Sequence, residues 1–447
     1  GQFYVDSRVK TITLEHASLP FTVVFEYELK LNDFGMIRFP RWVPRGFEQS
    51  CQQASFTAVV PNDNELLYDV HELDEPVVKR DDKVTTYRWA VENLPAIKWE
   101  PFRPVFAKVL PNVQAQLRRF KISDKHVGSY GSWKDFGQLI VELCKDRDEL
   151  PASLKAEINQ LVAGVDSEAE KIDLLYRFMQ ERMRYVGVQL GIGGWQPFSA
   201  AYVEKNRFGD CKALSNYMGA ILKEVGITSY PVLIYSGNRP FDTAREEFPT
   251  CVFNHMILYV PSEDTYLECT SSNAPTGYLS ESTLDRNVLL ITPEGGQLAR
   301  TPALEPSEHG HLRRIDLTIS EDGSADLAIQ SRHYGGEQEY FRAVYHNLSP
   351  KEQKEWLHKY NFLPDVSGEN YQLLVSKEKP EVALTYSTHL DRYARKMGKR
   401  MFVPINKLFA YDDIPPKIED RKLPVVFKEC RFFVDSIYLQ LPENLTV

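Results

Sequence analysis

Residues 206–226 read NRFGDCKALSNYMGAILKEVG, and this stretch decides how the middle of the chain folds. Its start, from Arg207 to Asp210, is typical of a tight loop, and the remainder has the pattern of a helix that ends near Gly226. The apolar residues of the predicted helix recur every three or four positions, which indicates one buried face. These residues are Leu214, Tyr217, Met218, Ile221, Leu222 and Val225.

Cys211 occupies the first turn of this predicted helix, directly after Asp210, which is a good N-cap residue. Backbone N–H groups and the helix dipole favour a negative charge at such a position, so they stabilise a thiolate. The position therefore makes Cys211 a candidate nucleophile. The alternative is a small core residue, because free cysteines are usually buried and inert.

The length and composition of the chain describe an ordinary globular protein. Its 447 residues suffice for roughly three domains. A hydrophobic content of 43%, a charged content of 26% and a net charge of −9 argue against a basic face that binds nucleic acid. No apolar run is long enough to cross a bilayer. No signal peptide is present, and the first residues, Gly-Gln-Phe, lack a Met, so we expect a processed or engineered fragment.

The cysteines and histidines give little sign of a metal. The six cysteines contain no CxxC pair and no dense spacing, which favours neither a zinc site nor a disulfide framework. His309 and His311 flank one glycine and could bind a metal, but no third ligand lies near them in the sequence. We therefore expect no metal and no other cofactor.

Residues 1–115 have the pattern of an antiparallel β domain. Alternating and β-branched runs at 10–14, 22–29 and 84–89 are separated by Pro, Gly, Asn and Asp. This pattern predicts a β-sandwich. Three prolines between residues 100 and 115 indicate an extended connector that leads into the next domain.

The rest of the chain divides into a mixed region, residues 116–300, and a mainly β region, residues 301–447. The mixed region carries the apolar stripes of helices, one of which starts with a capping box from Ser167 to Glu170. In the mixed region we predict helices over 130–143, 157–162 and 167–185. In the β region we predict strands at 314–319, 325–329, 382–386 and 432–437 and helices over 337–348 and 350–360.

A glycine-rich segment, RYVGVQLGIGGWQPF at residues 184–198, precedes the cysteine helix. Its glycines let the backbone run close to another group, but the order of elements and the missing Lys exclude a phosphate loop. Gln189, Trp195 and Gln196 are amide and indole donors in or beside this segment. Each is a candidate to hold an oxyanion near Cys211, and the sequence does not choose among them.

A β-hairpin is predicted over residues 251–271, with its turn at 261–264. That turn pairs His255 with Thr270, and it places Glu268 diagonally opposite His255 on the same face of the sheet. Diagonal neighbours of this kind are roughly 7–8 Å apart at Cα, within reach of long side chains. A slip of one residue would separate them. The alternative for His255 is a partly buried histidine with a structural role only.

Cys211, His255 and Glu268 fit one chemistry. A thiolate attacks an acyl carbon, an imidazole transfers the proton, and a carboxylate orients the imidazole. The order of these residues, on a helix, a strand and a second strand, predicts a cysteine enzyme.

The three motifs resemble the transglutaminase-like superfamily of papain-like cysteine enzymes. They are GDCK at 209–212, FNH at 253–255 and YLECT at 266–270, and they cover about the middle third of the chain. The glycine-rich segment is similar to the lead-in of bacterial multidomain members, which carry β domains on both sides. Two positions depart from the family: Glu268 stands where Asp is usual, and Ala213 stands where close relatives tend to have an acidic residue.

The resemblance implies an α+β fold, in which a papain/transglutaminase-like core is flanked by two mainly antiparallel β domains. It implies a cysteine peptidase or amidase that hydrolyses amide bonds of a peptide or protein, and a secreted or periplasmic location. Three other functions stay open. The first is an acyl transferase that cross-links amines, and the second is a non-catalytic module whose β domains bind a protein or glycan. The third is a purely structural multidomain adaptor.

Overall fold

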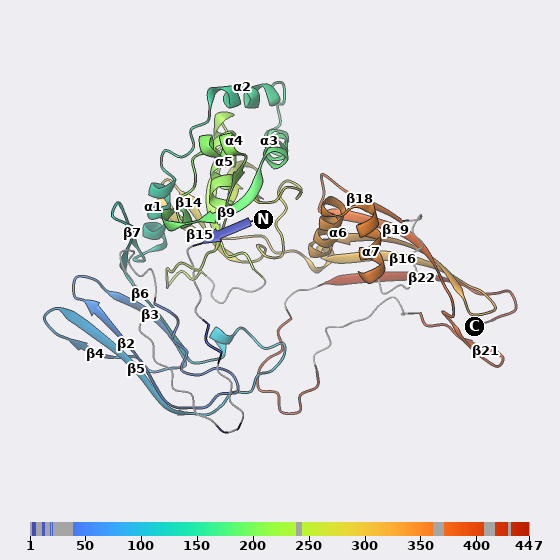
Figure 1. Cartoon of the computed structure of the whole chain (residues 1–447), viewed down its shortest axis with the longest axis horizontal. Helices are drawn as coiled ribbons and strands as arrows, with labels where there is room; N and C mark the ends of the chain where they lie inside the picture. Colours follow the sequence, from blue (N-terminus) through green and yellow to red (C-terminus); the bar gives the residue numbers. More distant parts are fainter. Residues whose placement is uncertain are drawn as a thin grey trace.

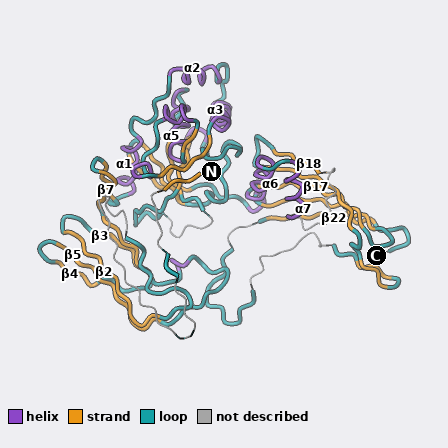
Figure 2. Tube along the Cα trace, viewed as in Figure 1, coloured by secondary structure: helices purple, strands orange, loops and turns teal. Residues whose placement is uncertain are grey.

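The computed structural model describes residues 2–5, 11–13, 18, 20, 39–237, 244–360, 371–405, 416–427 and 431–446. It contains helices together with mainly antiparallel sheets, which confirms the α+β prediction. The strands near the N-terminus, the helical middle and the C-terminal sheet form three separate groups of elements (Figures 1 and 2). No helix among the described residues is both long enough and apolar enough to cross a membrane.

The N-terminal strands form two small antiparallel sheets. The first has the order β2 (Cys51–Pro61), β5 (Val84–Leu94) and β4 (Val77–Arg80), and the second pairs β3 (Leu66–His71) with β6 (Asn112–Leu117). The stacked rings of Phe56 and Trp89, 5.5 Å apart, form part of the core between them.

The sequence predictions for this region have mixed outcomes. The strand predicted at 84–89 is present as β5. Residues 11–13, in the centre of the strand predicted at 10–14, are exposed and belong to no strand, so that prediction is wrong over its described part. The strand predicted at 22–29 lies outside the described residues.

The middle of the chain is built on a five-stranded antiparallel sheet. Its strand order is β13-β12-β11-β14-β15, and α1 (Trp133–Cys144) packs against β14 and β15. The packing of α1 is close, because a Cβ atom on Gly137 would lie 2.0 Å from the backbone nitrogen of Gly296. The strands are β11 (Tyr230–Ile234), β12 (His255–Val260), β13 (Thr265–Leu267), β14 (Asn287–Thr292) and β15 (Gly295–Arg300).

A second, three-stranded sheet lies beside the cysteine helix. Its central strand is β9 (Arg184–Gln189), formed by the glycine-rich segment, and β10 (Phe208–Gly209) pairs with it in parallel. The other neighbour of β9 is β1 (Gln2–Val5), so the first residues described belong to a sheet in the middle of the molecule. A hairpin, β7 (Arg119–Ser123) and β8 (His126–Ser129), leads into α1.

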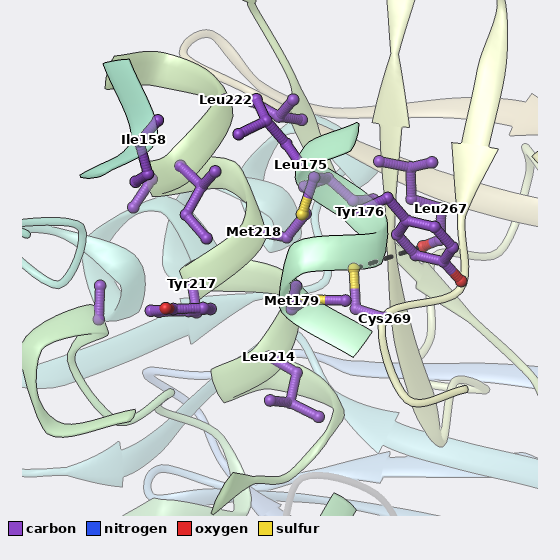
Figure 3. Close-up of a cluster of buried hydrophobic side chains, with 14 of the residues drawn as sticks. Ile158, Leu175, Tyr176, Met179, Leu214, Tyr217, Met218, Leu222, Leu267 and Cys269 are labelled. Carbon is purple, nitrogen blue, oxygen red and sulfur yellow. Dashed lines mark hydrogen bonds between the residues drawn. The ribbon is translucent and has the colours of Figure 1, made fainter. Parts of the chain in front are cut away.

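The helix α5 (Cys211–Glu224) is the centre of the hydrophobic core, as its apolar stripe predicts. Leu214, Met218 and Leu222 are buried among side chains of α3 and of the strand β13, and Figure 3 shows Met179 and Leu267 among them. The other helices of this region are α2 (Ala152–Leu161), α3 (Glu168–Arg182) and α4 (Ala200–Asn206).

The helix predictions of the middle region are confirmed in type, with shifted ends. The α1 helix starts at Trp133, three residues later than predicted, because the hydroxyl of Ser132 caps it by accepting from the N–H of Asp135. In α3 the hydroxyl of Ser167 accepts a hydrogen bond from the N–H of Glu170, as the capping box predicts.

The C-terminal region is a twisted five-stranded sheet with two helices. Its strand order is β18-β19-β17-β16-β22, and the edge strand β22 runs parallel to β16. The strand and helix predictions for this region are confirmed. The elements are β16 (Gly310–Ile319), β17 (Ala325–Tyr334), α6 (Gly336–Asn347), α7 (Pro350–Tyr360), β18 (Tyr371–Val375), β19 (Glu381–Leu390), β20 (Arg395–Met397), β21 (Arg400–Phe402) and β22 (Phe432–Gln440).

Candidate active site

The loop before α5 places the thiol of Cys211 at the start of a helix. Asp210 is the N-cap, and its side chain accepts a hydrogen bond of 3.0 Å from the N–H of Ala213. Gly209 packs so tightly on the first turn that a Cβ atom there would lie 2.9 Å from the Cβ of Ala213. Cys211 is 4% exposed and belongs to the wall of a cavity. The helix start predicted from the sequence is confirmed.

A buried ion pair supports this turn. The ammonium group of Lys212 contacts the second carboxylate oxygen of Asp210, and both side chains are almost fully buried. A charge is stable in such a place only when it is paired, so Asp210 and Lys212 fix each other's position. The sequence analysis missed Lys212, although a cation two residues after a buried N-cap Asp is a recognisable signal.

The strands β12 and β13 bring His255 and Glu268 together. Their register pairs Val260 with Thr265, which is the register that the turn predicts. Glu268 follows the last residue of β13, and its Oε2 lies 2.9 Å from Nε2 of His255. Both side chains are 13% exposed, so this contact is shielded from water.

Both strands of the hairpin are shorter than predicted. The strand β12 starts at His255 rather than 251, because Asn254 bonds the backbone of Ser236 through its side chain, at 2.7 and 2.9 Å. The strand β13 ends at Leu267 rather than 271, because the next residues fold into a turn in which the N–H of Ser271 donates to the carbonyl of Glu268.

Thr270 orients the Glu268 carboxylate. Oε1 of Glu268 accepts hydrogen bonds from the N–H of Thr270, at 3.0 Å, and from its hydroxyl, at 2.5 Å. Tyr176 also donates from its hydroxyl to the carbonyl of Glu268, at 2.8 Å. The sequence analysis quoted Thr270 only as part of a motif and missed this role, which depends on the turn that ends β13.

The imidazole of His255 lies beside both Glu268 and Cys211. Nε2 is 2.9 Å from Oε2 of Glu268, and the sulfur of Cys211 is close enough to the ring to raise its pKa. Burial by itself lowers the pKa of His255, but the nearby Glu268 carboxylate and the sulfur of Cys211 outweigh it and raise the pKa to about 10. Burial acts to raise the pKa of Glu268, but His255 and Thr270 outweigh it and lower the pKa. An imidazolium beside a carboxylate is therefore the favoured charge state.

The thiol and the imidazole face a cavity of about 330 Å³. Gln189 and Trp195 line this cavity together with Cys211, so two of the three oxyanion candidates are near the thiol. The structure does not bring Gln196 there, because its side chain accepts from Arg147 and donates to the carbonyl of Leu143, at 2.8 and 3.2 Å. The full lining is Ile140, Gln189, Gly194, Trp195, Cys211, Lys212, Leu233, Cys251, Phe253, Asn254, His255 and Met256.

The N-terminal strand β6 holds one wall of the cavity. The amide group of Gln116 donates to the carbonyl of Pro249, at 2.6 Å, and accepts from the hydroxyl of Thr250, at 2.5 Å. These residues directly precede the lining segment that runs from Cys251 to Met256. The region that the sequence assigned to a separate β domain thus contributes contacts to the site.

Comparisons with known proteins give distant similarities. Residues 1–98 match the family DUF3857, described as a domain of unknown function with a solved structure. No curated protein matches the chain.

Two solved structures are similar to parts of the chain. One is a "putative protease" from Parabacteroides distasonis, with 13% identity and a TM-score of 0.42 over 82% of this chain and 71% of that one. The other is a "putative cysteine protease" from Cytophaga hutchinsonii, with 9% identity and a TM-score of 0.22 over 49% of this chain and 72% of that one.

Proposed function

We propose that the protein is a cysteine hydrolase of the transglutaminase-like type, a peptidase or amidase that cleaves amide bonds. Cys211 is its nucleophile, His255 its general base and acid, and Glu268 the group that orients the imidazole. One observation carries the proposal. The imidazole of His255 lies between a carboxylate at 2.9 Å and the thiol at the start of α5, in the wall of a cavity.

The contacts support a two-step reaction. The thiolate of Cys211 attacks the amide carbon, and Nδ1 of His255 delivers its proton to the leaving amine, which leaves a thioester. Water then attacks the thioester while His255 accepts its proton, and the acid and the free thiolate are released. Glu268 keeps Nε2 of the imidazole occupied throughout, so the ring cannot turn away from the sulfur.

The oxyanion of each tetrahedral intermediate needs hydrogen-bond donors close to the sulfur. The backbone N–H groups at the start of α5 are available there, and the side chains of Gln189 and Trp195 line the same cavity. We assign the oxyanion to these groups and not to Gln196, whose amide is bonded to Leu143 and Arg147.

The lining of the cavity favours a peptide-like substrate with an apolar side chain. Leu233, Phe253 and Met256 supply an apolar wall next to the imidazole. Lys212 is the charged side chain of the lining besides His255, and it is already paired with Asp210. A protein or glycan partner for the flanking β regions, and a secreted or periplasmic location, follow from the same family resemblance.

Hydrolysis is preferred over transfer to an amine. A transferase needs a dry, aromatic tunnel for the amine, whereas the aromatic residues of the lining are Trp195 and Phe253. The nearby segment at 244–249 contains Arg245, Glu246 and Glu247, and its Arg245 bonds Asp69 at 2.7 Å. Such a polar segment admits water.

A thiol-labelling experiment tests the nucleophile. The full chain is treated with iodoacetamide near pH 7, and the labelling rate of each cysteine is followed by peptide mapping. We expect Cys211 to react fastest and His255→Ala to slow it strongly. Cys144 is the internal control, because burial raises the pKa of its thiol to about 12. If Cys211 reacts no faster than Cys144, the proposal that the protein is a cysteine enzyme is contradicted.

A second experiment separates the reactions. Glutamine-containing peptides are incubated with the protein and a labelled primary amine, and mass spectrometry follows new termini and amine incorporation. We expect new termini, absent with Cys211→Ala. Amine incorporation without cleavage would show that the protein is a transferase and not a hydrolase. The absence of both products across a broad set of peptides would favour the non-catalytic module.

A further inference from the structure

We propose that the C-terminal sheet binds one divalent transition-metal ion, with Zn²⁺ as its natural ion. The ligands are Nδ1 of His311, Nδ1 of His333 and Oε2 of Glu337. This site lies outside the cavity of Cys211 and does not depend on the function proposed for it.

Strand pairing creates the site. His311 on β16 and His333 on β17 are directly opposite each other in the antiparallel register, so their side chains leave the same face of the sheet. After β17 the chain turns through Gly335, whose φ of 54° suits a glycine, and α6 begins at once. Glu337 in the first turn of α6 is thereby placed over the two imidazoles.

The three ligand atoms converge on one point. Oε2 of Glu337 is 3.0 Å from Nδ1 of His311 and 2.9 Å from Nδ1 of His333, and all three atoms lie within 4.8 Å of one another. Two ligands of one tetrahedral Zn²⁺ are about 3.3–3.4 Å apart, given metal bonds of about 2.0–2.2 Å. The two distances from Glu337 are a few tenths of an ångström shorter than this, so the carboxylate has to withdraw only slightly, and the two Nδ1 atoms, within 4.8 Å of each other, adjust to the same spacing.

A polar group of the kind that supports metal-binding histidines stands behind each imidazole, hydrogen bonded to His333 and at a longer distance from His311. Nε2 of His333 is 2.9 Å from the hydroxyl oxygen of Ser331, and that hydroxyl is 3.4 Å from the carbonyl oxygen of Leu384, to which it donates. The hydroxyl oxygen of Ser331 is then free to accept from Nε2–H. In that tautomer, Nδ1 of His333 carries a lone pair that points at a carboxylate oxygen, and a cation between them resolves this contact.

The second imidazole repeats this arrangement with a carboxylate. Nε2 of His311 faces Oδ1 of Asp435 at 3.5 Å, and Arg313 holds that carboxylate through two hydrogen bonds of 2.7 Å. A carboxylate behind a histidine fixes the ring and strengthens it as a ligand.

Aromatic side chains cover the faces of the two ligand rings. The ring of His311 stacks on Phe433, with centroids 4.6 Å apart, and that of His333 lies 4.0 Å from Phe341. Both histidines are more than nine-tenths buried. Two imidazoles and one carboxylate match the preference of Zn²⁺ for N and O ligands, with one position left for water.

The competing arrangement is a triad without metal, in which both imidazoles donate from Nδ1 to Glu337. The full chain, stripped with EDTA, is titrated with Zn²⁺ against a chromophoric chelator at pH 7.5. We expect one Zn²⁺ per chain. His333→Ala and Glu337→Gln should each weaken binding by more than about 100-fold. His389→Ala, an exposed histidine in the same sheet, is the matched control and should bind as the wild type does.

Two conservative variants keep the test decisive if the ligand variants fold poorly. Ser331→Ala and Asp435→Asn leave all three ligands in place, and each should weaken Zn²⁺ binding by roughly 10–100-fold while one ion per chain still binds. Co²⁺ then reports the ligands. We expect the visible bands of four-coordinate Co²⁺ without a thiolate charge-transfer band. No stoichiometric binding by the wild type, full affinity in Glu337→Gln, or a thiolate band would each overturn the proposal.

Discussion

The molecule contains two buried clusters in which histidine meets glutamate, and they are built differently. In the middle region, Nε2 of His255 lies 2.9 Å from Glu268, and the thiol of Cys211 is the other neighbour of the ring. In the C-terminal sheet, His311 and His333 both direct Nδ1 at one oxygen of Glu337. The first arrangement suits the proton transfer that we propose, whereas the second suits the metal binding that we propose.

The two clusters also differ in how accessible their imidazoles are. His255 lines a cavity of about 330 Å³, so a substrate can reach it. His311 and His333 are packed against Phe433 and Phe341. The same residue types can thus support different chemistry. In the two functions that we propose, the third partner and the ring nitrogen that faces it make the difference between proton transfer and cation binding.

The largest expected effect is the loss of the nucleophile. Cys211→Ala should reduce amide hydrolysis to the level of the reaction without enzyme, because the two remaining residues cannot form a thioester. It should leave Zn²⁺ binding unchanged, since the thiol is not a ligand of the other cluster. Peptide cleavage and Zn²⁺ titration on the same preparation check both statements, and residual cleavage above the blank would show another nucleophile.

A smaller loss is expected from Glu268→Gln. The amide keeps the size of the side chain but removes the charge that orients the imidazole and stabilises the imidazolium, so kcat should fall by roughly 10²–10⁴-fold. Glu268→Asp retains the charge but is one methylene shorter, and its kcat should lie between that of the wild type and that of Glu268→Gln. Steady-state kinetics of the three proteins measures this order. An unchanged kcat in Glu268→Gln would show that another group orients His255.

The pH profile should shift in a defined direction. Glu268 and the sulfur of Cys211 together raise the pKa of His255 from 6.5 to about 10 by stabilising the protonated ring, so activity should persist at pH values where free imidazole is neutral. Removing the charge in Glu268→Gln lowers that pKa, so the alkaline limb of kcat/KM should move to lower pH.

The same shift contributes to folding stability. The raised pKa stabilises the folded protein most below pH 6.5, and this contribution disappears as the pH rises toward 10. Urea unfolding at several pH values measures this contribution to the free energy of unfolding.

For the pH profile of activity, an alkaline limb of kcat/KM at the same pH in the wild type and in Glu268→Gln would contradict the assignment of His255 as the base.

The smallest expected effect tests whether the clusters are independent. Glu337→Gln should change the labelling rate of Cys211 by no more than roughly twofold, because distant sites without shared partners act additively. Two contacts could nevertheless couple the clusters. Tyr278 and Glu281 lie in the segment that follows Glu268; the hydroxyl of Tyr278 donates to Glu339 of α6, and Glu281 contacts His309. A change of the labelling rate above tenfold would show that these contacts couple the two clusters.

The parts of the site that depend on local sequence could be predicted. The start of α5 at Cys211 followed from one N-cap residue and one apolar stripe. The side-chain contact between His255 and Glu268 followed from the length of one turn, because a short turn fixes the register of a hairpin. The type of each element in the C-terminal sheet followed from its apolar period.

The remaining features depend on pairing and side-chain direction between distant residues. His333 lies beside His311 only because β16 and β17 are paired, so this cluster cannot be recognised from residues that are close in sequence. Gln196 follows Trp195 directly, but its side chain is directed to Leu143 and away from the cavity. Thr270 gained its role from a turn that ended the strand early.

The parallel pairing of β22 with β16 has a consequence for the order of folding. Gly310 pairs with Phe432, so the contact closes a loop of more than one hundred residues, which is slow to form by diffusion. During synthesis β16, β17 and α6 can assemble well before β22 leaves the ribosome. Asp435, which stands behind His311, therefore arrives last. A nascent chain would hold all three converging ligands before it acquires the carboxylate that strengthens one of them.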